Sequence, residues 1–115
     1  MHNFKEDILK AAKGEPIQAV VIGERFKTFR REVHELPEDP TDDLTYFPNS
    51  VMPWWEAEEI LDYSYDDDYG APDCHAITAW TPSRVLFICT YDGSTWVASV
   101  PRNPTDHSPI LHGGG

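Results

Sequence analysis

Hydrophobic and polar residues alternate most regularly in the last part of the chain, between residues 76 and 100. This period of two is typical of strands that have one buried and one solvent-facing side. It predicts three antiparallel strands, near residues 76–81, 84–91 and 94–100. The middle strand is apolar on both faces, as expected of a strand that is paired on each side.

Two turns connect these strands. Asp92-Gly93 stands between the last two, and this dipeptide favours a tight hairpin because a type I′ turn needs positive φ at both central residues. Pro82-Ser83 is less suited to a tight turn, since proline cannot adopt a positive φ. We therefore expect a slightly longer loop there.

A helical pattern opens the chain. Asn3 followed by Glu6 is typical of a helix start, in which Asn3 caps the first turn. Four apolar residues then share one face at helical spacing: Phe4, Ile8, Ala11 and Ala12. Gly14 and Pro16 end the pattern. Residues 17–22 follow as a buried strand that would end at Gly23 and pair with the later strands.

Residues 24–36 fit two structures. Their apolar residues recur at helical spacing, which favours an amphipathic helix, but a second strand in a hairpin with residues 17–22 stays open. Residues 37–53 hold four prolines among acidic residues, which predicts an irregular connection. A connection of this length is unusual in a small domain and indicates a functional loop.

A second helix is predicted from Trp54 to Tyr63, with Pro53 at its first position. Acidic residues near its start favour a helix through the helix dipole. Its inward face would consist of Trp54, Ala57, Ile60, Leu61 and Ser64.

Together these elements predict an α+β fold: a small, mainly antiparallel sheet of about four strands, packed chiefly on one face by two or three helices. Residues 1–104 would form a single domain, and residues 105–115, which contain Pro109 and three glycines, an extended tail. No apolar run approaches the roughly 20 residues that cross a bilayer. The charged amino terminus does not resemble an export signal, so we expect a cytoplasmic protein with reduced cysteines.

The net charge of −11 is concentrated in the middle of the chain. Residues 35–72 contain twelve acidic residues and no Lys or Arg, whereas residues 1–34 carry +2 and residues 73–115 carry −1. Such a segment repels phosphates, so direct binding to nucleic acid is not expected. We expect Arg84 and Arg102, the only positive charges after residue 31, to pair with acids from residues 56–73.

The paired tryptophans at 54 and 55 form the candidate binding surface, because they lie beside the acidic residues. Two adjacent helical positions cannot both turn into the core, so one ring is expected to be exposed. Exposed aromatic side chains among charges are typical of protein-binding patches; the alternative, with one ring in the core and the other resting on the loop, stays open. The candidate interface residues are Trp54, Trp55, Glu56, Glu58, Glu59, Asp66, Asp67 and Asp68.

No catalytic residue, metal site or cofactor is predicted. The acidic run 66–68 does not fit the EF-hand spacing when counted back from Gly70. Cys74 and His75 are adjacent, and adjacent strand residues point to opposite faces, so they do not readily share a reaction centre. A small hydrolytic or metal-dependent enzyme using Asp66–Asp68, Asp73 and His75 is kept as an alternative.

Five segments of the second half form a distinctive pattern. They are Leu61-Asp62-Tyr63, Tyr69-Gly70-Ala71-Pro72-Asp73-Cys74-His75, Ala79-Trp80-Thr81, Tyr91-Asp92-Gly93-Ser94-Thr95-Trp96 and Pro101-Arg102-Asn103-Pro104. In these segments the chain resembles a family of small proteins encoded by bacteriophages of actinobacteria. The resemblance does not extend to residues 25–53 and brings no activity or site residues with it. It implies a phage origin and action in the cytoplasm of a bacterial host.

The sequence thus predicts a small acidic phage accessory protein that binds a host protein and modulates it, without contact with a membrane. A specific version is nucleic-acid mimicry, in which carboxylates occupy a basic groove on the partner. Besides the enzyme, the alternative is a structural or assembly protein that forms a homodimer through an exposed strand edge.

Overall fold

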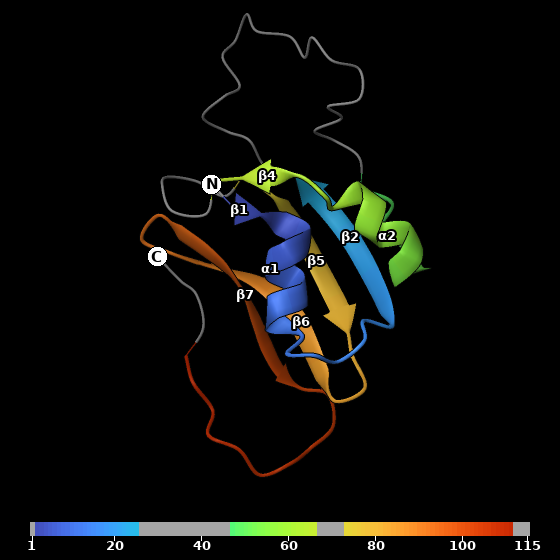
Figure 1. Ribbon diagram of the computed structural model, residues 1–115. Helices are drawn as coiled ribbons and strands as arrows, with labels where there is room; N and C mark the ends of the chain where they lie inside the picture. Colours follow the sequence, from blue (N-terminus) through green and yellow to red (C-terminus); the bar gives the residue numbers. More distant parts are fainter. Residues whose placement is uncertain (1, 26–46, 67–72, 112–115) are drawn as a thin grey trace, which may run out of the picture.

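The structure is a computed structural model, and it describes residues 2–25, 47–66 and 73–111. Five strands form an antiparallel sheet in the order β3-β2-β5-β6-β7 (Figure 1). They are β2 (Ala19–Arg25), β3 (Val51–Pro53), β5 (His75–Trp80), β6 (Arg84–Tyr91) and β7 (Ser94–Pro101). A second, two-stranded sheet pairs β1 (His2–Asn3) with β4 (Ser64–Tyr65). With helices α1 (Phe4–Ala11) and α2 (Trp54–Ile60), the predicted α+β fold is confirmed.

The three predicted C-terminal strands are present as β5, β6 and β7, and the predicted hairpin turn joins the last two. Asp92 and Gly93 have φ values of 51° and 87°, the positive values that a type I′ turn requires. The other connection is a three-residue loop, 81–83, in which Thr81 and Arg84 exchange hydrogen bonds. These contacts are local in sequence, and together with the buried face of the strands they fix the register of this part of the sheet.

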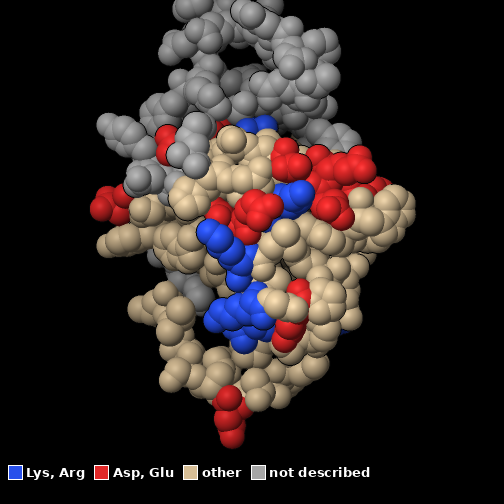
Figure 2. Space-filling view, viewed as in Figure 1, with Lys and Arg blue, Asp and Glu red and all other residues tan. Residues whose placement is uncertain are grey.

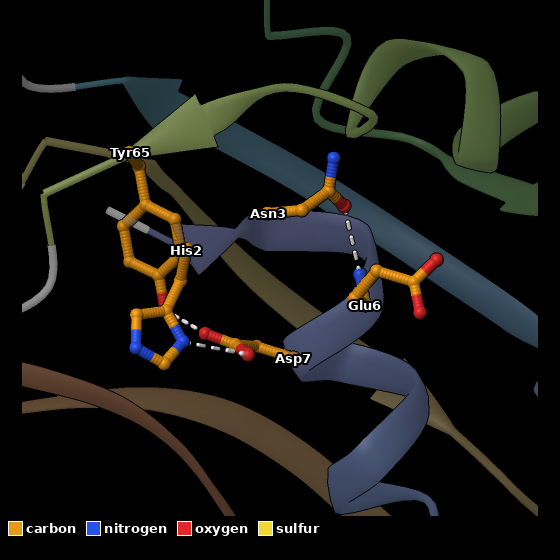
Figure 3. Close-up of polar contacts among 5 residues, drawn as sticks. All are labelled: His2, Asn3, Glu6, Asp7 and Tyr65. Atoms are coloured by element: carbon orange, nitrogen blue, oxygen red, sulfur yellow. Dashed lines mark hydrogen bonds and ion pairs between the residues drawn. The ribbon is translucent and has the colours of Figure 1, made fainter.

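Helix α1 begins as predicted. The Oδ1 atom of Asn3 accepts a hydrogen bond of 2.9 Å from the N–H of Glu6 (Figure 3). The helix ends before Lys13 and Gly14, both of which have positive φ. It lies across the front of the sheet in Figure 1, with Phe4 and Ile8 fully buried against it.

One core holds the domain together. It lies between one face of the sheet and both helices, so the two helices cover the same side, as predicted. Its largest fully buried side chains are Tyr65, Phe4, Ile8, Ile22, Leu61, Leu86 and Val20. Strand alternation places Val21, Thr78, Val85 and Val100 on the opposite face, where they are half-buried.

The second strand begins at Ala19 instead of residue 17 and ends later than the predicted residue 22. It continues through Gly23 to Arg25, because Gly23 lies close to β5 and pairing with β5 resumes at Arg25 and His75. A helix over 24–36 therefore cannot begin at residue 24, and residues 26–36 lie outside the described part. Within 37–53, the prediction of an irregular connection was wrong for residues 51–53, which form the short edge strand β3; residues 37–46 lie outside the described part.

The second helix is shorter than predicted, because the residues after Ile60 form hydrogen bonds with the amino-terminal segment instead of continuing the helix. Pro53 precedes the helix as its cap, and the last helical residue is Ile60 instead of Tyr63. The carbonyl of Tyr63 accepts the N–H of Phe4 at 2.8 Å, and Ser64 joins β4. Ser64 is consequently exposed instead of part of an inward helical face.

The predicted ion pairs of the two late arginines were wrong. Nε of Arg84 donates to Oγ of Ser99 at 2.6 Å, and Arg102 donates to Oε1 of Gln18 and to the carbonyl of Thr81. Arg84 begins β6 and the N–H of Arg102 donates to the carbonyl of Ser83, so both arginines lie where the 81–83 loop turns. This end of the sheet is opposite to β4 (Figure 1). After Pro101 the described tail is exposed, and within 2–25, 47–66 and 73–111 no helix is long and apolar enough to cross a membrane.

Candidate protein-binding surface

The two tryptophans of α2 have different environments. Trp54 is half-buried and packs against the core, whereas Trp55 is 69% exposed. This is the separation that the sequence predicts for neighbouring helical positions. Ala57 and Leu61 anchor the same helix in the core, so Trp55 is presented from a fixed element.

Carboxylates surround this ring. Glu56 and Glu59 are exposed and Glu58 is half-buried, and Figure 2 shows acidic side chains gathered at the upper right, over α2. Within the part of the chain that the structure describes, no Lys or Arg forms an ion pair with them. We call Trp55, Glu56, Glu58 and Glu59 the α2 surface.

Two of the three charges of the α2 surface, those of Glu58 and Glu59, do not stabilise the helix itself. Acidic residues stabilise the first turn of a helix, but in the last turn they face the negative end of the helix dipole. Only Glu56 lies in the first turn, and the last turn of α2 contains no basic residue. The acidic end of this helix therefore has no local stabilising role that would explain it.

Sequence reasoning missed one exposed apolar residue in the strand that precedes α2. Val51 lies in β3, directly before α2, and is 69% exposed. Its strand is only three residues long and ends in Pro53, so no alternating pattern could reveal it. Val51 pairs with Val21, on the sheet face opposite the helices, so its side chain points away from the side of the sheet on which α2 packs.

The structure does not place Asp66 with the α2 surface. Asp66 follows β4, which runs away from α2 in Figure 1, and its N–H donates to Oδ2 of Asp73 at 3.4 Å. Asp67 and Asp68 lie outside the described residues. The predicted set of interface residues is therefore divided, with Trp54 to Glu59 on one element and Asp66 on another.

Asp73 and His75 belong to a second group, the buried polar cluster, which also includes Arg25, Tyr63 and Cys74. The guanidinium carbon of Arg25 lies 3.9 Å from the centre of the Tyr63 ring, and its Nη2 lies 3.9 Å from Oδ1 of Asp73. The Tyr63 hydroxyl lies 2.8 Å from Nδ1 of His75 and accepts the His75 N–H at 2.9 Å. These contacts join the ends of β2, β4 and β5.

The electrostatics of the buried polar cluster do not favour a thiol nucleophile. Burial raises the pKa of the Cys74 thiol to about 12, and the negative charge of Asp73 adds to this rise. Burial likewise raises the pKa of Tyr63. Among the residues described, no group of three or more His, Cys, Asp or Glu could hold a metal ion. The enzymatic alternative gains no support from this part of the chain.

A third polar group ties the amino terminus to the fold. The Tyr65 hydroxyl donates to Oδ2 of Asp7 at 2.7 Å, and Nδ1 of His2 lies 3.3 Å from Oδ1 of the same carboxylate (Figure 3). Asn3 donates to Oδ1 of Asp62 at 2.8 Å. These contacts link β1 and α1 to the segment around β4, which is a structural role.

We expect the stability of the protein to fall as the pH rises from about 9 to 12, because of Cys74. In this interval the unfolded thiol loses its proton while the folded thiol keeps it, so the unfolded state is favoured by at most about 1.4 kcal/mol per pH unit. Urea unfolding at a series of pH values measures the slope. The variant Cys74→Ala should show a shallower decline, and an identical slope in both proteins would contradict the assignment.

No family model matches this sequence, and no curated protein or solved structure is significantly similar to it.

Proposed function

We propose that the protein is a non-enzymatic binding module that contacts a basic surface of another protein through the α2 surface. The observation that supports this most directly is the exposure of Trp55 among carboxylates without ion pairs in the described part of the chain. Burying a large aromatic ring in a partner pocket is the commonest source of strong binding energy in protein interfaces.

The carboxylates would contribute differently from the ring. Charges at the rim of an interface mainly accelerate association and select the partner, and their effect decreases with salt. Glu56, Glu58 and Glu59 are suited to this role because no base neutralises them within the described residues. The partner surface should therefore combine an apolar pocket with surrounding Lys or Arg residues.

Two further features of the sequence extend the proposal. The excess of acids over residues 35–72 supports mimicry of a nucleic-acid backbone, so the basic surface would be one that normally holds phosphates. The resemblance to actinobacteriophage proteins supports a partner in the cytoplasm of the bacterial host. In this setting the protein would modulate the partner by occupying its groove.

A pull-down from an actinobacterial lysate tests the proposal. The tagged full-length protein should retain one stoichiometric partner at low salt and lose most of it at high salt. Trp55→Ala should weaken this binding by at least about tenfold, the usual effect at an interface anchor. Tyr91→Ala is the matched control, because Tyr91 is also exposed, at 58%, but lies at the β6–β7 hairpin.

Three results would contradict the proposal. An equal loss of partner binding in Trp55→Ala and Tyr91→Ala would place the contact outside the α2 surface. Binding that salt does not weaken would exclude a basic partner. A melting temperature raised by divalent ions would favour the metal-dependent enzyme instead, since a ligand of the folded state stabilises it.

A further inference from the structure

Strand β7 forms an open edge of the five-stranded sheet. It is last in the strand order, and within the described ranges no strand pairs with its outer side (Figure 1). It is eight residues long, contains no charged side chain and pairs with β6 in unbroken register. Natural proteins usually protect such edges with charges, bulges, prolines or short strands, because an open edge can pair with another chain.

The opposite edge of the same sheet shows this protection. Strand β3 is only three residues long, ends in Pro53 and leads directly into α2. In β7 the only proline is Pro101, at the last position, where it does not interrupt the edge. The β7 edge can therefore pair with another strand, whereas the β3 edge is protected against such pairing.

The hydrogen-bonding direction of β7 follows from its two ends. Tyr91 and Ser94 flank the two-residue turn and bond to each other across it, and the N–H of Arg102 donates to the carbonyl of Ser83 at 2.9 Å. Because the direction alternates along an antiparallel strand, the even-numbered residues bond to β6. The main-chain groups of Thr95, Val97 and Ser99 consequently point outward.

We propose that a second copy of this chain pairs with β7, strand to strand and antiparallel, about a two-fold axis at Val97. Val97 would bond to Val97 of the second copy, and Thr95 to Ser99 of the second copy in both directions. This register uses every outward N–H of the strand and gives about six main-chain hydrogen bonds. Such an interface is self-complementary, as a two-fold axis requires.

The side chains fit the same register. Trp96, which is 39% exposed, would lie opposite Ala98 of the second copy, so a large ring meets a small side chain twice. Asp92 precedes the strand and Arg102 follows it, so antiparallel pairing brings opposite charges toward each other at both ends. Parallel pairing would instead place Asp92 beside Asp92.

Two features could oppose the pairing, and both are compatible with it. Arg84 donates to the outward carbonyl of Ser99 at 3.2 Å, but a carbonyl oxygen has two lone pairs and can accept a second bond. The net charge of −11 makes two copies repel each other. However, the acidic helix α2 adjoins the β3 edge, which is the edge of the sheet away from β7. Two copies joined at β7 would carry their α2 surfaces at opposite ends of a continuous sheet (Figure 1).

Sedimentation velocity of the full chain, at concentrations covering about two orders of magnitude, tests the proposal. The wild-type protein should sediment as a dimer at the upper end, and added salt should not dissociate it, unlike binding at the α2 surface. Val97→Pro removes a central outward N–H while leaving the bonds to β6 intact, so it should be monomeric. Val97→Ala keeps the N–H, controls for the lost side chain and should remain dimeric.

Amide hydrogen exchange of the wild-type protein gives an independent result, should Val97→Pro fail to fold. The amides of Thr95, Val97 and Ser99 should exchange at least about tenfold more slowly in the dimer than in dilute monomer. A monomer at all concentrations would overturn the proposal, even if another protein binds this edge. A dimer that survives Val97→Pro, or in which these three amides exchange fast, would also overturn it.

Discussion

Phe4→Ala is expected to lower the free energy of unfolding by about 3–5 kcal/mol, the usual cost of removing a fully buried aromatic ring. Phe4 has no exposed surface. Its ring meets Tyr65 edge-on with centroids 5.1 Å apart and lies 5.5 Å from the ring of Tyr63. Since domains of this size are stable by only about 5–15 kcal/mol, a large share of the stability would be lost.

Urea unfolding followed by circular dichroism measures this loss. The control is Leu9→Ala on the same helix, because Leu9 is 39% exposed whereas Phe4 is fully buried, and its truncation should cost less than about 1 kcal/mol. The slope of the unfolding free energy with urea should be the same in the three proteins. Equal losses for the two variants would mean that α1 does not pack as described.

Tyr63→Phe is expected to destabilise the protein by about 1–3 kcal/mol, although it removes a single oxygen atom. The hydroxyl accepts the main-chain N–H of His75 and lies within hydrogen-bonding distance of its Nδ1. Both groups lie in the core, where a polar group that loses its hydrogen bond also lacks water. The ring stays in place beneath Arg25, so the cation–π contact is preserved in the variant.

The matched control is Tyr91→Phe, which removes a hydroxyl from an exposed tyrosine of the same protein and should leave stability unchanged. Thermal and urea unfolding of both variants give the comparison. A loss below about 0.5 kcal/mol for Tyr63→Phe would show that another group or a water molecule replaces the hydroxyl.

The parts of the fold that could be predicted from the sequence are those with local causes. The β6–β7 hairpin is fixed by Asp92-Gly93, and the start of α1 is fixed by Asn3, whose side chain caps the first turn. In both places a residue three or fewer positions away decides the conformation. Helix geometry alone predicts that one of the tryptophans at 54–55 faces away from the core, and the structure shows that this ring, Trp55, is exposed instead of resting on the loop.

The remaining parts depend on distant residues. Strands β1 and β4 are two residues long, too short for any periodic pattern, and exist because they pair with each other. The same pairing shortens α2 at Ile60. The partners of Arg84 and Arg102 could not be deduced from charge, because the tertiary fold places these side chains beside neutral acceptors.

The pairing of β1 with β4 has a consequence for the order of events during synthesis. Asn3 bonds to Asp62, and Phe4 to the carbonyl of Tyr63, so α1 has no docking site until some sixty later residues have left the ribosome. The β5–β6–β7 segment, by contrast, is closed by short local loops and can form as soon as it emerges. Helix α1 is therefore synthesised well before the segment on which it packs, and its apolar face stays exposed to chaperones until that segment emerges.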